Sequence, residues 1–196
     1  MYLMEKITRN IFHALGVGVV ASAAIISTTV SAHSPPHAVI ASAHPLATEA
    51  GHQILEQGGN AFDAAIAVGA TLAVVEPAGS GMGGGGFWLL DDVANQRQVF
   101  VDGRETAPLK AHKDMYLNEE GEVVRDWAIN TPLAAGIPGQ AAAFAHLAKH
   151  YGKLPLATSL APAIRLAEEG FEVTPRYQAL IEWRVPVINR DRKSVV

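Results

Sequence analysis

One short segment constrains this chain more than any other: a run in which glycine fills six of eight positions, from Gly79 to Gly86. It leads directly into Phe87-Trp88-Leu89-Leu90, whose composition is typical of a β-strand. Glycine loses more backbone entropy on folding than any other residue. A glycine run between two apolar segments therefore indicates that the backbone passes where a Cβ atom would not fit. We predict a tight backbone turn packed beside or beneath a pocket.

Part of this run, Gly79-Ser80-Gly81-Met82-Gly83-Gly84, formally matches the dinucleotide-binding pattern G-x-G-x-x-G. That pattern binds a pyrophosphate only where a strand precedes it and a helix follows, because the helix N-terminus receives the phosphates. Here a helical segment precedes the glycines and a strand follows, and no Lys-Ser or Lys-Thr pair completes a phosphate loop. This order argues against nucleotide binding. The attached apolar strand argues against a flexible linker.

Arg104 is the first candidate for a binding residue. It stands in Asp102-Gly103-Arg104-Glu105-Thr106-Ala107-Pro108, at the end of a predicted hairpin. A guanidinium group is planar, permanently charged and suited to holding a carboxylate through two parallel hydrogen bonds. The segment thus indicates a site for a small anion. The residues alone leave a second interpretation open, in which Arg104 is a surface or structural residue paired with Asp102 or Glu105.

The rest of the chain predicts helices and a few short strands. A helix over residues 61–75 is apolar all round, rich in alanine and too short to span a bilayer, so we expect it to be buried against a sheet. We place Pro162 in the first turn of its helix. The predicted elements are a strand at 38–41, helices at 45–57 and 61–75, hairpin strands at 87–91 and 98–102, a helix from the turn at 136–139 to about Tyr151, and a helix at 156–169.

The N-terminus has the pattern of an export signal. Lys6 and Arg9 precede an apolar stretch over residues 11–30, and Val30-Ser31-Ala32 fits a signal-peptidase site. We predict a signal peptide at residues 1–32, a mature chain from His33, and a periplasmic or secreted protein without a stable membrane anchor. An uncleaved anchor is the alternative, because the stretch is long enough to span a bilayer.

Other functional classes find little support. The chain has no cysteine, which excludes disulfides, thiolate catalysis and cysteine-based zinc sites. A formal charge of −4 and the lack of a basic patch argue against nucleic acid. His146 and His150 have metal-ligand spacing, but Leu147 stands where a zincin has its glutamate and no third ligand is evident, so we read them as a polar helix face. We expect no metal ion and no cofactor.

Five blocks, in this order and spacing, resemble the N-terminal part of the large subunit of a gamma-glutamyltranspeptidase, a family also called glutathione hydrolases. The resemblance runs from about Ala38 to about Asn189. The blocks are Gln57-Gly58-Gly59-Asn60-Ala61-Phe62-Asp63-Ala64-Ala65, Val75-Glu76-Pro77, Gly81-Met82-Gly83-Gly84-Gly85-Gly86-Phe87, Asp102-Gly103-Arg104-Glu105-Thr106-Ala107-Pro108 and Tyr151-Gly152-Lys153-Leu154-Pro155.

The resemblance implies an α+β fold, the four-layer αββα architecture of N-terminal nucleophile hydrolases, only partly present in residues 33–196. It implies transfer of the gamma-glutamyl group of glutathione or related compounds to water or an amino acid. In that family the arginine matching Arg104 holds the alpha-carboxylate of the substrate, and the adjoining Glu105 is a supporting residue. The implied partner is a small subunit cut from the same precursor, giving a heterodimer.

The chain departs from the family in one large respect. The family's nucleophile is a threonine that self-cleavage makes N-terminal, and it lies in the small subunit. We therefore assign no catalytic residue, and expect this part alone to be inactive. Two alternatives stay open: a related cephalosporin or glutaryl acylase, and a non-catalytic secreted protein. The threonines outside the expected context are Thr48, Thr71, Thr106, Thr131, Thr158 and Thr174.

Overall fold

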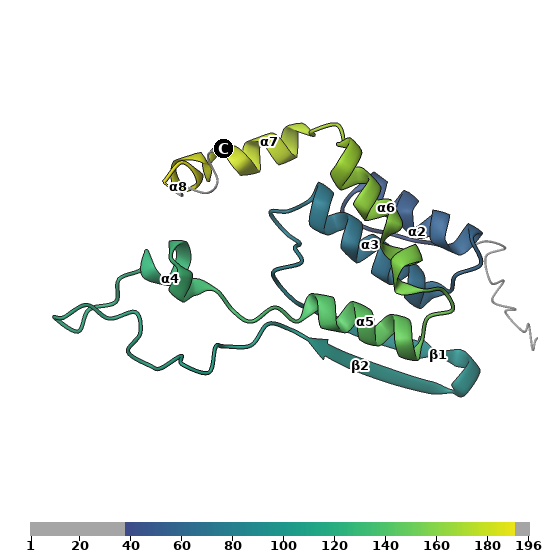
Figure 1. Cartoon of the computed structure of the whole chain (residues 1–196), viewed down its shortest axis with the longest axis horizontal. Helices are drawn as coiled ribbons and strands as arrows, with labels where there is room; N and C mark the ends of the chain where they lie inside the picture. The colour runs from purple at the N-terminus through teal and green to yellow at the C-terminus, as the bar shows by residue number, and fades with distance from the viewer. Residues whose placement is uncertain (1–37, 191–196) are drawn as a thin grey trace, which may run out of the picture. The chain divides into compact units, whose positions relative to one another are not determined.

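The computed structural model describes residues 38–190 (Figure 1). The chain divides into two units, residues 1–38 and 39–196, and every element below belongs to the second. The predicted signal peptide lies outside the described residues. The elements are α2 (Pro45–Glu56), α3 (Ala61–Val75), β1 (Gly86–Asp92), β2 (Arg97–Gly103), α4 (Trp127–Asn130), α5 (Gln140–His150), α6 (Leu156–Glu169), α7 (Pro175–Glu182) and α8 (Val185–Ile188), with short 3-10 turns at Val93–Asn95 and Pro132–Ala134.

Proline, glycine and asparagine residues set the ends of helices α2 and α3. Pro45 opens α2, and Gly58 follows its C-terminus with a φ of +90°, a left-handed conformation that favours glycine. Asn60 caps α3, because its side chain accepts hydrogen bonds from the backbone N–H groups of Phe62 and Asp63. The predicted helices at 45–57 and 61–75 are confirmed, the first one residue shorter.

Helix α3 is buried, but not in the way the sequence predicted. Its main packing partners are the helices α2 and α6, and a smaller contact joins it to α5. The hairpin joins the same core cluster as Ile66 and Ala70 of α3 through Leu90, with Trp88, Val99 and Val101 packed against it. The predicted burial is confirmed, but α3 packs mainly on helices, and the hairpin is the smaller part of its surroundings. Small side chains instead let neighbouring helices approach closely.

The aromatic centre of the core joins the helices to the hairpin. Phe144 of α5 is fully buried, and the Trp88 ring of β1 meets it edge-on at 6.0 Å between centroids. A Cβ atom added at Gly69 of α3 would lie 2.9 Å from the Phe144 ring, so glycine is needed at that crossing. Helix α5 runs alongside β2 in Figure 1, where the chain returns from the long segment 104–139.

The two strands form one antiparallel hairpin, one residue longer at each end than predicted. Its register pairs Phe87 with Asp102 and Leu89 with Phe100. The Asn95 side chain donates a hydrogen bond to Asp92 at 2.8 Å, and Arg97 adds an ion pair at 3.1 Å. These contacts hold the pKa of Asp92 below its usual value, since each favours the ionised carboxylate.

Two further predictions need correction. Residues 38–41 form no strand, because β1 and β2 pair only with each other in the described part of the chain and no strand edge adjoins this segment. Helix α6 has its predicted bounds, but Pro162 lies in its interior and not in its first turn. Pro162 is buried there, so packing against the core offsets the loss of one backbone hydrogen bond.

Within residues 38–190, none of the helices is both long and apolar enough to cross a membrane.

Candidate anion-binding site

The backbone that carries Arg104 is clamped between two glycines from distant parts of the chain. A Cβ atom added at Gly85 would lie 2.5 Å from the carbonyl oxygen of Gly103 and 2.6 Å from the Arg104 Cα. A Cβ added at Gly139 would collide with the same carbonyl group and with that of Arg104. The predicted close backbone passage is therefore confirmed at Gly85. It is absent at Gly83, around which nothing lies within 4 Å of such an atom.

Backbone hydrogen bonds tie the same three segments together. The N–H groups of Gly139 and Gln140 donate to the Gly84 carbonyl at 3.1 and 3.2 Å. Thr106 and Ile137 exchange hydrogen bonds of 3.1 and 2.8 Å, which close the far side of the Arg104 segment. Because these partners are backbone groups of ordered segments, the position of the Arg104 Cα is fixed from both sides.

The Arg104 side chain is exposed and available to a ligand. Its Cζ lies 5.9 Å from the centre of the Phe87 ring, within the range of a cation–π contact. In the described part of the chain, no acidic side chain lies within 4.0 Å of the guanidinium. Asp102 instead uses its carboxylate to accept the backbone N–H of Arg104 at 3.0 Å. The alternative interpretation, a permanent ion pair with Asp102 or Glu105, is wrong for this structure.

Glu105 is also exposed, immediately beside Arg104. Its side chain stem packs against Gly136, where an added Cβ would lie 3.2 Å from the Glu105 Cγ. Its role as a supporting residue stays a prediction.

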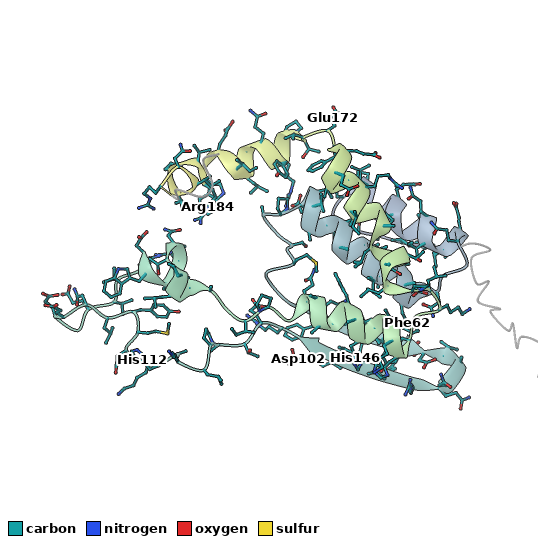
Figure 2. The ribbon with its side chains drawn as sticks, in the orientation of Figure 1. Phe62, Asp102, His112, His146, Glu172 and Arg184 are labelled. Carbon is teal, nitrogen blue, oxygen red and sulfur yellow. The ribbon has the colours of Figure 1, made fainter. Side chains whose placement is uncertain are left out.

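A groove of about 510 Å³ runs along β2 and α5 from the Arg104 end. His146 of α5 lies on its wall, and Figure 2 labels it together with Asp102. The rings of His146 and His150 are 4.5 Å apart. Among residues 38–190, no group of three histidine, aspartate or glutamate side chains is placed to hold a metal ion. The residues lining the groove are Val99, Phe100, Val101, Asp102, Gly103, Arg104, Gly139, Ala142, Ala143 and His146.

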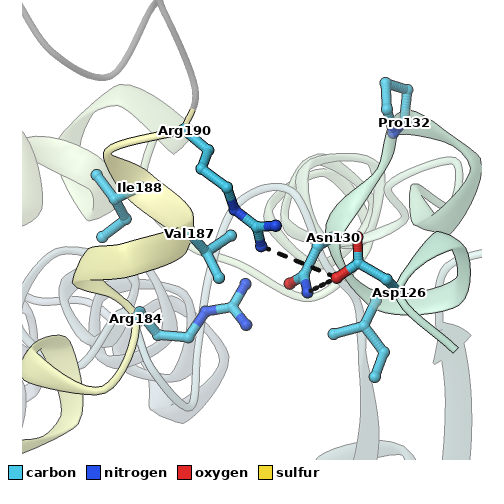
Figure 3. A pocket seen from close by; sticks show the side chains of 8 residues that line it. Asp126, Asn130, Pro132, Arg184, Val187, Ile188 and Arg190 are labelled. Atoms are coloured by element: carbon cyan, nitrogen blue, oxygen red, sulfur yellow. Dashed lines mark hydrogen bonds and ion pairs between the residues drawn. The ribbon is translucent and has the colours of Figure 1, made fainter.

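A second hollow, of about 600 Å³, lies between α4 and α8 and shares no lining residue with the Arg104 groove (Figure 3). Asp126 engages two of its polar side chains. The Asn130 side chain donates to Asp126 at 2.7 Å, and Arg190 lies 3.9 Å from the same carboxylate. We assign no ligand to it.

Sequence reasoning missed a buried polar junction, in which Asp63 and Asn60 bind the backbone of residues 151–153. Asp63 is fully buried, and its carboxylate accepts the backbone N–H groups of Asn60 and Lys153, each at 2.9 Å. Asn60 in turn donates to the Tyr151 carbonyl at 2.7 Å. A Cβ at Gly152 would lie 2.5 Å from Asp63 Oδ1. The available signal was the presence of both segments among the blocks that carry the family resemblance.

Two contacts at Arg104 itself were also not predicted from the sequence. Gly139 was interpreted as part of a turn before a helix, whereas it also passes against the Arg104 backbone. Phe87 was interpreted only as a strand residue, whereas its ring underlies the guanidinium. Cross-strand register is the signal that places Phe87 opposite Asp102, two residues from Arg104.

Comparison with known proteins identifies the family of this chain. The family model for gamma-glutamyltranspeptidase matches residues 47–195. A glutathione hydrolase proenzyme of Escherichia coli K12 is 42% identical over 135 residues, which are 69% of this chain and 23% of that protein. The crystal structure of Helicobacter pylori gamma-glutamyltranspeptidase matches with a TM-score of 0.76 and 41% identity, over 82% of this chain and 47% of that one. A cephalosporin acylase from Bacillus halodurans matches with a TM-score of 0.60 and 34% identity, over 80% of this chain and 31% of that one.

The fold is thus α+β, and the described helices and hairpin form part of the four-layer architecture of N-terminal nucleophile hydrolases. Within that class, the chain belongs to the gamma-glutamyltranspeptidase family. It spans about a quarter of the length of the curated relatives, 23% for the Escherichia coli protein.

Proposed function

We propose that this chain is the N-terminal part of a gamma-glutamyltranspeptidase precursor that recognises gamma-glutamyl compounds, such as glutathione, through Arg104. The observation that carries the proposal is a guanidinium group on a doubly clamped backbone, exposed and free of acidic partners within residues 38–190. The family match over residues 47–195 supports the identity of the substrate.

Each part of the geometry has a role in this proposal. The alpha-carboxylate of the donor accepts two hydrogen bonds from the Arg104 fork. Glu105 beside it supports the site, and its negative charge suits the donor's alpha-ammonium group. The clamped backbone keeps the guanidinium in one place, so little ordering is needed when the substrate binds.

The covalent chemistry belongs to a segment outside this chain. In the proposed enzyme, the hydroxyl oxygen of an N-terminal threonine attacks the gamma-carbonyl carbon of the donor, and its proton passes to the free alpha-amine of that threonine. The gamma-amide C–N bond then breaks, and the proton leaves with the amine product. Water or an amino acid's amine next attacks the ester and regenerates the threonine. The Escherichia coli relative is a glutathione hydrolase proenzyme, which supports processing from a precursor.

Export is a further part of the proposal. Residues 1–32 are removed as a signal peptide, and the mature protein is periplasmic or secreted. Mass spectrometry of the exported protein is expected to find His33 at its N-terminus. An intact Met1 in a membrane fraction would contradict the proposal and favour the uncleaved anchor.

A related acylase is the second candidate, because the cephalosporin acylase of Bacillus halodurans also matches the fold. Glutaryl and gamma-glutamyl groups share the carboxylate that Arg104 holds and differ in the alpha-ammonium group. Arg104 therefore suits both donors, and the experiment must compare them.

The test uses a complete precursor that contains this sequence. We expect it to release glutamate from glutathione with a higher kcat/KM than it shows on a glutaryl amide. Preference for the glutaryl amide would identify an acylase, and no release from either donor would overturn both proposals. The 196-residue chain alone is expected to release nothing, since it has no matching nucleophile. Release at enzyme-like rates would contradict that expectation.

A further inference from the structure

The structure fixes the Arg104 backbone far more firmly than its side chain. Gly85, Gly139 and the Thr106–Ile137 pair hold the main chain. The long side chain beyond the Cα is exposed, and arginine loses considerable rotamer freedom when it is held in one conformation. Recognition through a bidentate fork depends on the direction of the guanidinium plane. Something other than the backbone must therefore set that direction.

The Phe87 ring faces the Arg104 guanidinium at cation–π range. The Arg104 Cζ lies 5.9 Å from the centre of its ring. Asp102 is the cross-strand partner of Phe87, but its carboxylate is engaged by the Arg104 backbone N–H. In the part of the chain that the structure describes, no carboxylate competes with the ring for the guanidinium.

The Phe87 ring is itself held in place. It stacks on Phe100 of the neighbouring strand, with 5.5 Å between ring centroids and 26° between ring planes. Both rings lie on the same face of the hairpin, opposite the face that packs on the helices. A stacked pair on two hydrogen-bonded strands presents a fixed aromatic surface. Arg104 rests on its Phe87 end.

We propose that Phe87 is a positioning residue for substrate recognition: its ring bears the face of the Arg104 guanidinium and leaves the N–H edge directed to the donor's carboxylate. A cation–π contact engages the face of a guanidinium, whereas hydrogen bonds leave from its edge, so the two interactions are compatible. This inference rests on the function proposed above. It adds a second residue to the specificity for donors that carry an alpha-carboxylate.

The experiment compares Phe87→Leu, Phe87→Tyr and the control Leu89→Ala in the complete precursor. Leu89 lies on the same strand and the same exposed face, and it has no aromatic ring to offer the guanidinium. For a gamma-glutamyl amide, Phe87→Leu is expected to raise KM about 3- to 30-fold with little change in kcat. Phe87→Tyr and Leu89→Ala are expected to stay within about twofold of the wild type. Self-cleavage reports that each variant folds.

Two comparisons separate positioning from a structural role. A 4-aminobutanoyl amide lacks the alpha-carboxylate, so Phe87→Leu is expected to leave its kinetics unchanged. In an Arg104→Ala background, Phe87→Leu is expected to add no further loss. The proposal would be overturned if Phe87→Leu lost equally on both donors or left KM unchanged. It would also be overturned if Phe87→Tyr lost as much as Phe87→Leu.

A second measurement does not depend on catalysis. In the refolded 196-residue chain, the ring current of Phe87 is expected to shift the Arg104 side-chain proton resonances upfield. That shift should vanish in Phe87→Leu and persist in Phe87→Tyr, and its absence in the wild type would overturn the inference. A precursor that shows the shift but does not act on gamma-glutamyl donors would instead refute the proposed function alone.

Discussion

The two faces of the β1–β2 hairpin differ in what covers them. Trp88 and Leu90 on the inner face pack against the cluster around Phe144. The outer face bears Phe87, Leu89 and Phe100, which are 53%, 77% and 61% exposed. Alternation along a strand normally separates an apolar face from a polar one. Here both faces carry large apolar residues, which is the composition of a sheet that is covered on both sides.

The contrast between the two faces shows where the Arg104 site lies. The inner face of the hairpin and the helices pack together into a buried core within the described residues. Arg104 rests on the outer, uncovered face, against Phe87. The inner face should therefore control stability, and the outer face should control recognition.

The largest expected effect contrasts one residue of each face. Phe144→Ala should lower the free energy of unfolding of the refolded chain by about 3–5 kcal/mol, because it removes a fully buried ring and leaves a cavity. Leu89→Ala should change it by less than about 0.5 kcal/mol, because Leu89 is already exposed. Urea titrations of both variants measure the contrast. Similar losses would show that the outer face is already packed.

The next effect concerns the buried polar junction around Asp63. Asp63→Ala should cost about 3 kcal/mol, because buried backbone N–H groups of Asn60 and Lys153 lose their acceptor. Asp91→Ala on the exposed face is the matched control and should cost less than about 0.5 kcal/mol. Urea midpoints again provide the measurement. If the two substitutions cost the same, the junction contributes nothing specific.

A smaller effect distinguishes two glycines of the same run. Gly85→Ala should destabilise the chain by about 1–3 kcal/mol, since the new methyl group meets the Gly103–Arg104 backbone. Gly83→Ala should be neutral or stabilising by up to about 1 kcal/mol, because open space surrounds that position. Thermal unfolding of both variants tests this. A Gly83→Ala loss as large as that of Gly85→Ala would mean that the whole run is sterically required.

The smallest effect is a pH dependence at the far end of the hairpin. The hydrogen bond from Asn95, together with Arg97, lowers the pKa of Asp92 in the folded state. Its stabilising contribution is therefore fully present above the unfolded pKa of about 3.9 and is lost as the pH falls through the lower folded value. Carboxyl-carbon NMR should follow this titration. In Asn95→Ala, the Asp92 pKa should move back up, and an unchanged pKa would contradict the assigned cause.

The sequence predicted local structure well where a residue acts on its own neighbours. The helices predicted at 61–75 and 156–169 have those bounds, because Asn60 caps the first and Gly170, with a φ of +82°, ends the second. It failed where distant segments decide. Residues 38–41 have strand composition but no adjoining strand edge, and the interior position of Pro162 depends on burial against other helices.

The candidate site divides in the same way. Arg104 was identifiable because its chemistry and its motif are both local. The clamp by Gly139 and the support by Phe87 arise from contacts across the hairpin and from α5, which no local pattern encodes. Asp63 illustrates the same limit, because its partner at Lys153 is 90 residues away.

Kinetics of Arg104→Ala in the complete precursor test whether Arg104 recognises the donor's alpha-carboxylate. For a gamma-glutamyl amide, kcat/KM should fall about 30-fold to several thousandfold, which corresponds to the roughly 2–5 kcal/mol lost when one partner of a charge pair is removed. Arg104→Lys should also bind weakly, because an ammonium group cannot form two parallel hydrogen bonds.

The decisive comparison repeats the assay with a 4-aminobutanoyl amide, which lacks the carboxylate. The wild type should use this donor poorly, Arg104→Ala should change its kinetics little, and self-cleavage should survive in the variant. Unchanged kinetics on the gamma-glutamyl amide, or equal damage to both donors, would show that Arg104 is structural and would contradict the account.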